Sequence, residues 1–252
     1  MKSTGKKKLY LLFLNLFFIC VCLLALVPVL YVFLLSLSSG GGALITGASG
    51  SLTLENYRKI IVEKPFLQWL FNSIVLSMGT MLLAMITSVG ASYAFSRFRF
   101  RGKNAAMQLL LLLNAFPQIL SMFAIFRLFR LMNLLDSHAG LIFIYAGSMC
   151  IFGIWNMKGY FDSIPIEIEE AAKIDGSGNL QLILRIIMPL ARPAIIVTAV
   201  MVLIFVWNEY LFATTFMLRE ESYTLAGGLY QLLHRLRDLQ CHHAPGILMP
   251  PV

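Results

Sequence analysis

Long apolar stretches alternate with shorter polar segments along the chain. The hydrocarbon core of a bilayer is about 30 Å thick and an α-helix rises about 1.5 Å per residue, so about 20 apolar residues suffice for one crossing. This criterion predicts an all-α, polytopic transmembrane helix bundle. Five spans are expected, at residues 9–37, 69–95, 105–126, 139–157 and 194–218.

The first stretch has two interpretations, because a lysine-rich segment precedes it and Ser38-Ser39-Gly40 follow it. A cleaved signal peptide has an apolar core of about 7–15 residues, and this apolar run is about twice as long. We therefore expect the stretch to be retained as an anchor helix.

Polar residues inside the third and fifth stretches are candidates for a translocation path. Asn114, Pro117 and Gln118 interrupt the third stretch, which a bilayer tolerates where a helix faces protein or a water-filled cavity; a packing kink is the alternative. Glu209, next to Asn208, lies about 22 Å along the fifth helix. An ionisable residue inside a span is a functional candidate by default, although an interfacial anchor is the alternative here.

Composition agrees with a membrane protein. Hydrophobic residues make up 59% of the chain and charged residues only 13%, whereas a soluble domain carries about 25% charged residues. The net charge of +8 does not indicate a nucleic-acid partner, because the basic residues lie at the ends of the apolar stretches. The four cysteines show neither zinc-site spacing nor a disulfide framework.

Basic residues also predict the orientation of the chain. If the N-terminus is cytoplasmic, twelve Lys and Arg residues fall inside and six fall outside, leaving Arg235 and Arg237 in a tail whose side is undecided. Positive charge is enriched on the cytoplasmic side of membrane proteins. We therefore expect a cytoplasmic N-terminus and a cytoplasmic polar insert at residues 158–193.

The insert at 158–193 is expected to form two short helices. Pro165 suits a first helical turn, and Gly176 supplies the left-handed residue that ends a helix. The second helix is expected to begin near Asn179 and to stop at Pro189. Helices this short are not stable alone in water, so they must dock on this chain or on another. Periodicity leaves both possibilities open.

Each of the two helices carries an apolar stripe. Alanines make the middle of the first stripe flat, which permits close approach of another helix. Carboxylates near the start of the first helix complement the positive end of its dipole. The first stripe is Ile164, Ile168, Ala171 and Ala172, the second is Leu180, Ile183, Leu184 and Ile187, and the carboxylates are Glu167, Glu169 and Glu170.

This insert resembles the EAA loop of permease subunits of bacterial ABC importers. That loop reads Glu-Ala-Ala, three residues, Gly, nine residues, Ile-x-Leu-Pro. The chain has Glu170-Ala171-Ala172, then Gly176, then Ile186-Ile187-Met188-Pro189 at the same spacing, with Met in place of Leu as a volume-conserving change. Further segments resemble the carbohydrate importers, above all their smaller maltose/maltodextrin-type permease. These segments are residues 53–57, 72–73, 91–102, 158–165 and 207–210.

The resemblance implies a permease subunit of an ATP-driven sugar or oligosaccharide importer in the bacterial inner membrane. It implies as partners a second permease subunit, two cytoplasmic ATP-binding subunits and an extracytoplasmic solute-binding protein. The insert would seat in a cleft of an ATPase subunit, so bulky replacement of Ala172 or Gly176 is expected to uncouple ATP hydrolysis from transport. The residues expected to carry this contact are Glu170, Ala171, Ala172, Asp175, Gly176, Ile186 and Pro189.

Other function classes have less support. An importer for a non-sugar solute is one alternative, and a stand-alone secondary transporter or channel, which needs no ATPase, is another. The chain has no phosphate-binding Gly-x4-Gly-Lys-Ser/Thr, since Gly102-Lys103 is followed by Asn104. No constellation of His, Asp or Ser indicates an enzyme, and Cys241-His242-His243 with His234 is a weak metal motif. We expect no catalytic residue, cofactor or metal.

The last segment of the chain departs from the resemblance. Residues 1–231 are expected to form the transmembrane permease domain, and relatives continue with a further span. Residues 232–252 contain no apolar run of about 20 residues, so the expected sixth span is missing. We expect an atypical tail, with a frameshifted or truncated reading frame as the leading explanation.

Overall fold

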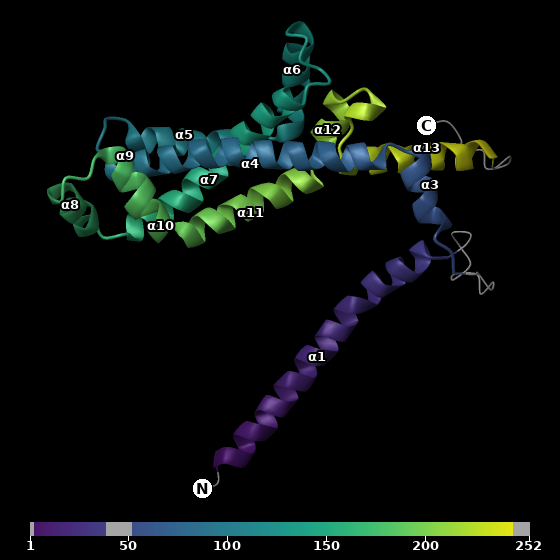
Figure 1. Cartoon of the computed structure of the whole chain (residues 1–252), viewed down its shortest axis with the longest axis horizontal. Coiled ribbons are helices and arrows are strands. Elements are labelled where there is room, and N and C mark those ends of the chain that lie inside the picture. The colour runs from purple at the N-terminus through teal and green to yellow at the C-terminus, as the bar shows by residue number, and fades with distance from the viewer. Residues whose placement is uncertain (1–2, 39–51, 244–252) are drawn as a thin grey trace. The chain divides into compact units, whose positions relative to one another are not determined.

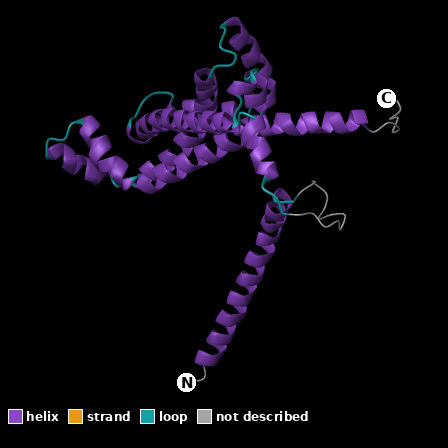
Figure 2. Cartoon of the chain, turned by 45° about the vertical axis from the view of Figure 1, so that its right-hand side comes forward, coloured by secondary structure: helices purple, strands orange, loops and turns teal. Residues whose placement is uncertain are grey.

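A computed structural model describes residues 3–38 and 52–243 of the 252-residue chain. It consists of two compact units, Met1–Pro65 and Phe66–Val252. Within the described residues every regular element is a helix, and the single β-bridge joins Ser38 to Leu52 (Figure 2). The predicted all-α class is therefore confirmed.

The first unit contains the long helix α1 (Ser3–Ser36) and the short helix α3 (Glu55–Glu63). The candidate span inside α1, Tyr10–Ser36, buries none of its most apolar window within the protein, which suits a helix that contacts lipid. The Asn56 Nδ2 donates hydrogen bonds to the carbonyl oxygens of Ser36 and Ser38, at 2.9 and 3.1 Å. These bonds fix the start of α3 against the end of α1.

The second unit is organised by three helices that lie side by side, α4, α7 and α11 (Figure 1). The face of α4 that packs on its neighbours carries small residues, among them Ser88 and Ser92. Small residues let membrane helices approach closely, and a side chain at Gly153 of α7 would collide with Ser88. The bounds are α4 (Phe66–Arg97), α7 (His138–Ser163) and α11 (Arg192–Asn208).

The third predicted span is two helices, α5 (Lys103–Ala115) and α6 (Gln118–Leu131), which meet at a 90° bend. The interruption at Asn114, Pro117 and Gln118 predicts a break or a kink in the span over 105–126, and the helix break lies at this position. Phe116 and Pro117 are extended at the bend, and a proline lacks the N–H that would continue the helical ladder.

The fifth predicted span also ends early. The helix α11 stops at Asn208, Glu209 is extended with φ −75° and ψ 120°, and the short helix α12 (Leu211–Phe216) follows. The expected continuous helix to residue 218 is corrected accordingly. Three described helices are long and apolar enough to cross a membrane, or up to five if each bent pair forms one span.

The polar insert between α7 and α11 is helical on both sides of a turn. Its first helix is α8, and its second half winds continuously through α9, a π-helical turn and α10 before an 80° bend into α11. Pro189 lies within the last turn, which ends one residue later than expected. The bounds are α8 (Ile166–Ile174), α9 (Asn179–Leu182), the π turn Ile183–Ile187 and α10 (Met188–Leu190).

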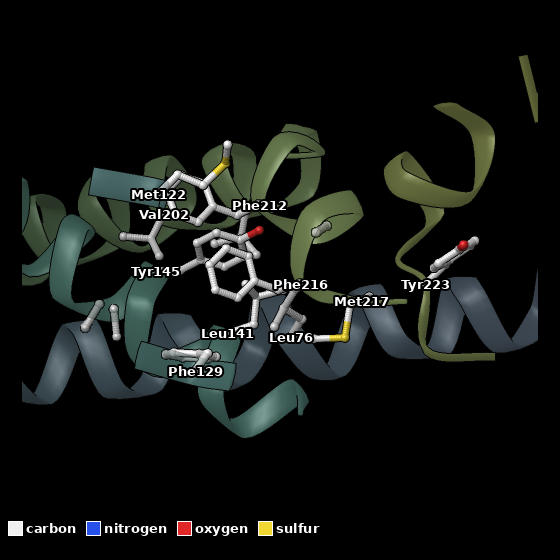
Figure 3. Packing of buried hydrophobic residues seen from close by; sticks show 14 of the residues in the cluster. Leu76, Met122, Phe129, Leu141, Tyr145, Val202, Phe212, Phe216, Met217 and Tyr223 are labelled. Carbon is white, nitrogen blue, oxygen red and sulfur yellow. The ribbon is translucent and has the colours of Figure 1, made fainter. Parts of the chain in front are cut away.

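Two hydrophobic clusters hold the second unit together. The larger one joins α4, α6, α7, α11 and α12, with Tyr145, Phe212 and Phe216 at its centre (Figure 3). The ring of Phe216 stacks on Phe212 at a centroid distance of 5.7 Å and meets Phe129 edge-on at 5.1 Å. The smaller cluster joins the insert to the bundle and contains Tyr93, Met157, Phe161, Ile164, Ala172, Leu182, Ile187 and Ala191.

The last described helix is α13 (Leu225–His243). The expected boundary between the permease domain and the tail, at 231/232, falls inside this helix, and that boundary stays a prediction. Residues 244–252 lie outside the described part of the chain.

Candidate functional site

The turn of the insert has the backbone that its glycine predicts. Gly176 has φ +84°, in the left-handed region that residues with a Cβ rarely adopt. The N–H of Ser177 bonds to the carbonyl of Ala172 at 3.0 Å, and the N–H of Gly176 bonds to that of Lys173 at 3.0 Å. These bonds satisfy the last carbonyls of α8, so the chain reverses over a short, fixed turn.

The helix α8 has one face against its own chain and one face exposed. Ala172 is buried in the smaller hydrophobic cluster, whereas Glu170 and Ala171 are exposed. Ile168 is 38% exposed, so the predicted apolar stripe is split between the two faces. Both alanines were expected to let the helix sit deep in a partner. Because Ala172 packs against its own chain, Ala171 is the one of the two that is exposed for such a contact. Asp175 is also exposed and lies next to the turn.

The buried carboxylate of α8 is Glu169, not Glu170. Glu169 is 2% exposed and accepts a bond from Arg97 Nε at 2.5 Å and one from Tyr93 OH at 3.0 Å. Arg97 Nη2 also donates to the carbonyl of Ile164 at 2.8 Å, which lies in the link between α7 and α8. A buried charge is tolerated when it is paired and hydrogen-bonded, as it is here.

Sequence reasoning treated Glu169 only as a complement to the helix dipole. The sequence does contain a sign that Glu169 is buried. Glu169 precedes Ala172 by three residues, so the two lie on the same face of the helix. Its partner Arg97 lies in the segment 91–102, which indicates an orientation and a family resemblance but no ion pair. The pairing needed the three-dimensional position of the end of α4.

The second half of the insert differs from its predicted stripe. Leu182 and Ile187 are fully buried, while Leu180 is 71% exposed and Leu184 is 52% exposed. A π turn adds a residue to each turn, so it rotates the following side chains relative to an α-helical register. The π turn at Ile183–Ile187 contributes to the change in register from Leu184 onward, whereas Leu180 and Leu182 lie before it in α9. Ile186 and Pro189 are partly buried.

A cavity of about 290 Å³ lies beside the break between α5 and α6. Asn114 and Gln118 line it, together with Tyr145 and Ser148 of α7. The Gln118 Nε2 donates to Ser148 Oγ at 3.1 Å, so the amide is held across the cavity wall. The other lining residues are Leu113, Phe116, Ser121, Ile125, Ile144, Ile151, Phe205 and Phe212.

The other two path candidates do not line this cavity. Asn208 lies in a separate apolar groove beside Trp207 and Ile74, and its amide donates to the carbonyl of Ile204 at 2.7 Å. The carboxylate of Glu209 accepts hydrogen bonds from the hydroxyl of Tyr145 and, at 3.0 Å, from the N–H of Phe212. Glu209 therefore supports two residues of the cavity wall without lining the cavity itself.

Among the described residues, no cluster of three or more His, Cys, Asp or Glu side chains could hold a metal ion. The side chains of Cys241, His242 and His243 lie outside the described part of the chain.

These features define a polytopic α-helical membrane protein with a docked helical insert on one face and a cavity at a helix break. Residues 86–225, more than half of the chain, match the family described as "Binding-protein-dependent transport system inner membrane component". The chain belongs to this family of inner membrane components, which confirms the predicted resemblance.

Its relatives include sugar transport permeases. The chain is 35% identical to the galactooligosaccharides transport system permease protein GanQ of Bacillus subtilis, over 72% of this chain and 65% of that protein. It is 31% identical to the maltose/maltodextrin transport system permease protein MalG of Yersinia pestis, over 86% and 78% of the two chains. The matched region spans slightly less than two thirds of GanQ.

A solved structure shows the same fold. The crystal structure of a bacterial ABC transporter involved in the import of the acidic polysaccharide alginate contains a chain that matches with a TM-score of 0.69. The match covers 97% of this chain and 99% of that one at 24% sequence identity.

Proposed function

We propose that this chain is the permease subunit of an ATP-driven sugar or oligosaccharide importer and couples to a separate ATPase through the insert at 158–193. The family and the sugar transport names of its relatives support the proposal. Its partners would be a second permease subunit, two ATP-binding subunits and an extracytoplasmic solute-binding protein. The ATPases, and not this chain, would hydrolyse ATP.

The observation that carries the proposal is the division of α8 into a held face and an open face. Glu169 and Ala172 fix the helix on this chain, and Glu170 and Ala171 stay exposed beside the fixed turn at Gly176. A helix docked in this way moves as a rigid body when another protein grips its open face. The small side chain of Ala171 permits close contact.

Replacement of Ala171 by Trp tests this proposal in the complete importer. The bulky side chain should keep the ATPase from seating, while α8 stays attached through its other face. We expect uptake to fall by at least about fivefold, with the chain still present in the membrane. The matched control is the exposed Ala105 at the start of α5, whose replacement by Trp should leave uptake unchanged. Normal uptake in the Ala171 variant would contradict the proposal.

The cavity beside the α5–α6 break is proposed to be part of the translocation path. Its lining residues combine aromatic rings, two amides and two serine hydroxyls, and none of them carries a charge. A neutral, polyhydroxylated solute suits such a wall, because its hydroxyls can bond to the amides while its apolar faces contact the rings. Replacement of Gln118 by Leu should lower sugar uptake without changing the amount of complex.

The N-terminus is proposed to be cytoplasmic. In a chain whose own cysteines are replaced by serine, single cysteines at Lys7 and Gly178 should resist a membrane-impermeant maleimide in intact cells. A cysteine at Glu63 should react. The reverse pattern would overturn both the orientation and the coupling role of the insert.

A further inference from the structure

The helix α4 is bound by side-chain hydrogen bonds at both of its ends. At the end that contacts the insert, Arg97 and Tyr93 hold the buried carboxylate of Glu169. We name these three residues the inner tie. Because Arg97 also donates to the carbonyl of Ile164, α4 is hydrogen-bonded both to α8 and to the link that leads into α8.

The opposite end of α4 is hydrogen-bonded to the loop between α12 and α13. The indole Nε1 of Trp69 donates to the carbonyl of Glu220 at 2.8 Å. The amide of Asn72 donates to the carbonyls of Glu221 and Tyr223, at 2.7 and 3.0 Å. Trp69 and Asn72 are 2% and 7% exposed, so the two donor side chains are buried. We name Trp69 and Asn72 the outer tie.

Both ties lie on α4, which is one unbroken helix of 32 residues. It is locked to α7, since Ser88 Oγ donates to the carbonyl of Cys150 at 3.2 Å and Gly153 lets the two helices meet there. Asn72 and Arg97 are about 38 Å apart along its axis. The ties therefore lie far beyond direct contact with each other.

The stretch of polypeptide that leads from the insert to the same loop is not one continuous helix. It bends by 80° between α10 and α11, and it breaks again at Glu209 before α12. A chain with two such breaks transmits displacement less directly than a straight, packed helix. The connection through α4 thus bypasses the sequence that joins the insert to the loop.

We infer that α4, packed on α7, is the rod that transmits displacement of the insert to the loop at 217–224 through the inner and outer ties. The inference rests on the proposed function, which supplies the displacement. Glu169, Arg97, Trp69 and Asn72 are positioning residues in this account.

The test uses the complete importer in proteoliposomes, with radiolabelled maltotriose uptake divided by ATP hydrolysed. Glu169→Gln removes the negative charge that pairs with Arg97 in the inner tie, and Asn72→Leu removes two of the three hydrogen bonds of the outer tie. Each single change should lower the uptake per ATP by at least about fivefold. The double variant should have the same uptake per ATP as the more impaired of the two single variants, because both changes interrupt the same connection. Mutations at distant, independent sites combine additively in free energy, and thus as multiplied losses.

Three further variants keep the test decisive. Tyr93→Phe removes one bond of the inner tie and gives a milder change if Glu169→Gln reduces the amount of complex. Gln118→Leu acts on the cavity, so its loss should multiply with that of Glu169→Gln. Glu63→Gln neutralises an exposed carboxylate of the first unit and should change nothing.

The possible outcomes separate the two claims. If the wild-type importer works and the losses of Glu169→Gln and Asn72→Leu multiply in the double variant, the role of α4 as the transmitting helix is contradicted. The proposed function is not affected by that result. A wild-type complex with no ATP-dependent uptake of any relative's sugar would overturn both.

Discussion

Glu169 is buried and Glu209 is partly buried, and the protein holds these two carboxylates in different ways. Glu169 is 2% exposed and faces the guanidinium of Arg97 at 2.5 Å. Glu209 is partly buried, and its hydrogen-bond donors among the described residues are neutral, namely the hydroxyl of Tyr145 and N–H groups at the start of α12. Glu169 thus depends on an opposite charge, whereas Glu209 depends on hydrogen-bond geometry. The two should respond differently to the same substitution.

Removal of the charge partner of Glu169 should give the largest effect. Arg97→Ala leaves a buried carboxylate unpaired, and breaking such a pair costs about 3–5 kcal/mol of unfolding free energy. The measurement is the thermal unfolding of the detergent-solubilised chain. Arg99→Ala is the matched control, since Arg99 is exposed two residues away. Equal stability of the two variants would show that the pair contributes nothing.

Replacement of Glu209 should cost less and should depend on shape more than on charge. Glu209→Leu removes all acceptors from Tyr145 and the start of α12, which should cost about 2 kcal/mol. Glu209→Gln keeps one acceptor oxygen and should cost less than about 1 kcal/mol. The same unfolding measurement compares the two variants. A glutamine variant as unstable as the leucine variant would contradict the neutral-donor interpretation.

The two alanines of α8 sharpen the contrast between held and open faces. Ala172→Leu inserts three carbon atoms into a packed cluster and should destabilise the chain by about 1–3 kcal/mol. Ala171→Leu points outward, so it should leave thermal stability unchanged and lower only transport. Loss of stability in the Ala171 variant would show that its side chain is not free.

A small loss of stability is expected at the turn of the insert. Gly176→Ala forces a Cβ into a backbone with φ +84°, which should cost about 1 kcal/mol. Gly178→Ala is the control, because Gly178 has φ −71° and open space around its Cα. Unfolding curves of the two variants should differ by that amount, and identical curves would exclude strain at Gly176.

Sequence patterns predicted the features that depend on local chemistry. Apolar length predicted the long helices α1, α4 and α7, Gly176 predicted the left-handed turn, and Pro117 with its polar neighbours predicted the break in the third span. The EAA-like loop was identified by its resemblance to the permease subunits of ABC importers, and the chain belongs to the matched family of inner membrane components. The roles of the residues in that loop stay a prediction.

Features that depend on the relative placement of distant elements could not be predicted in the same way. The end of α11 at Asn208 lies within an apolar run and has no Pro or Gly to mark it. The π turn at Ile183–Ile187 changes which residues face the bundle, and hydrophobic periodicity assumes an α-helical register. Glu169 and Arg97 are 72 positions apart, so their pairing follows only from how α8 packs on α4.

The most direct test of the account places a photo-crosslinking amino acid at position 171 in the complete importer. Because Ala171 is on the open face of α8, irradiation should join this chain to an ATP-binding subunit. The same amino acid at Val197, an exposed position on α11, should give no such adduct. An adduct with the ATP-binding subunit from position 171 alone is the predicted result. Its absence from both positions would contradict the assignment of the insert as the coupling element.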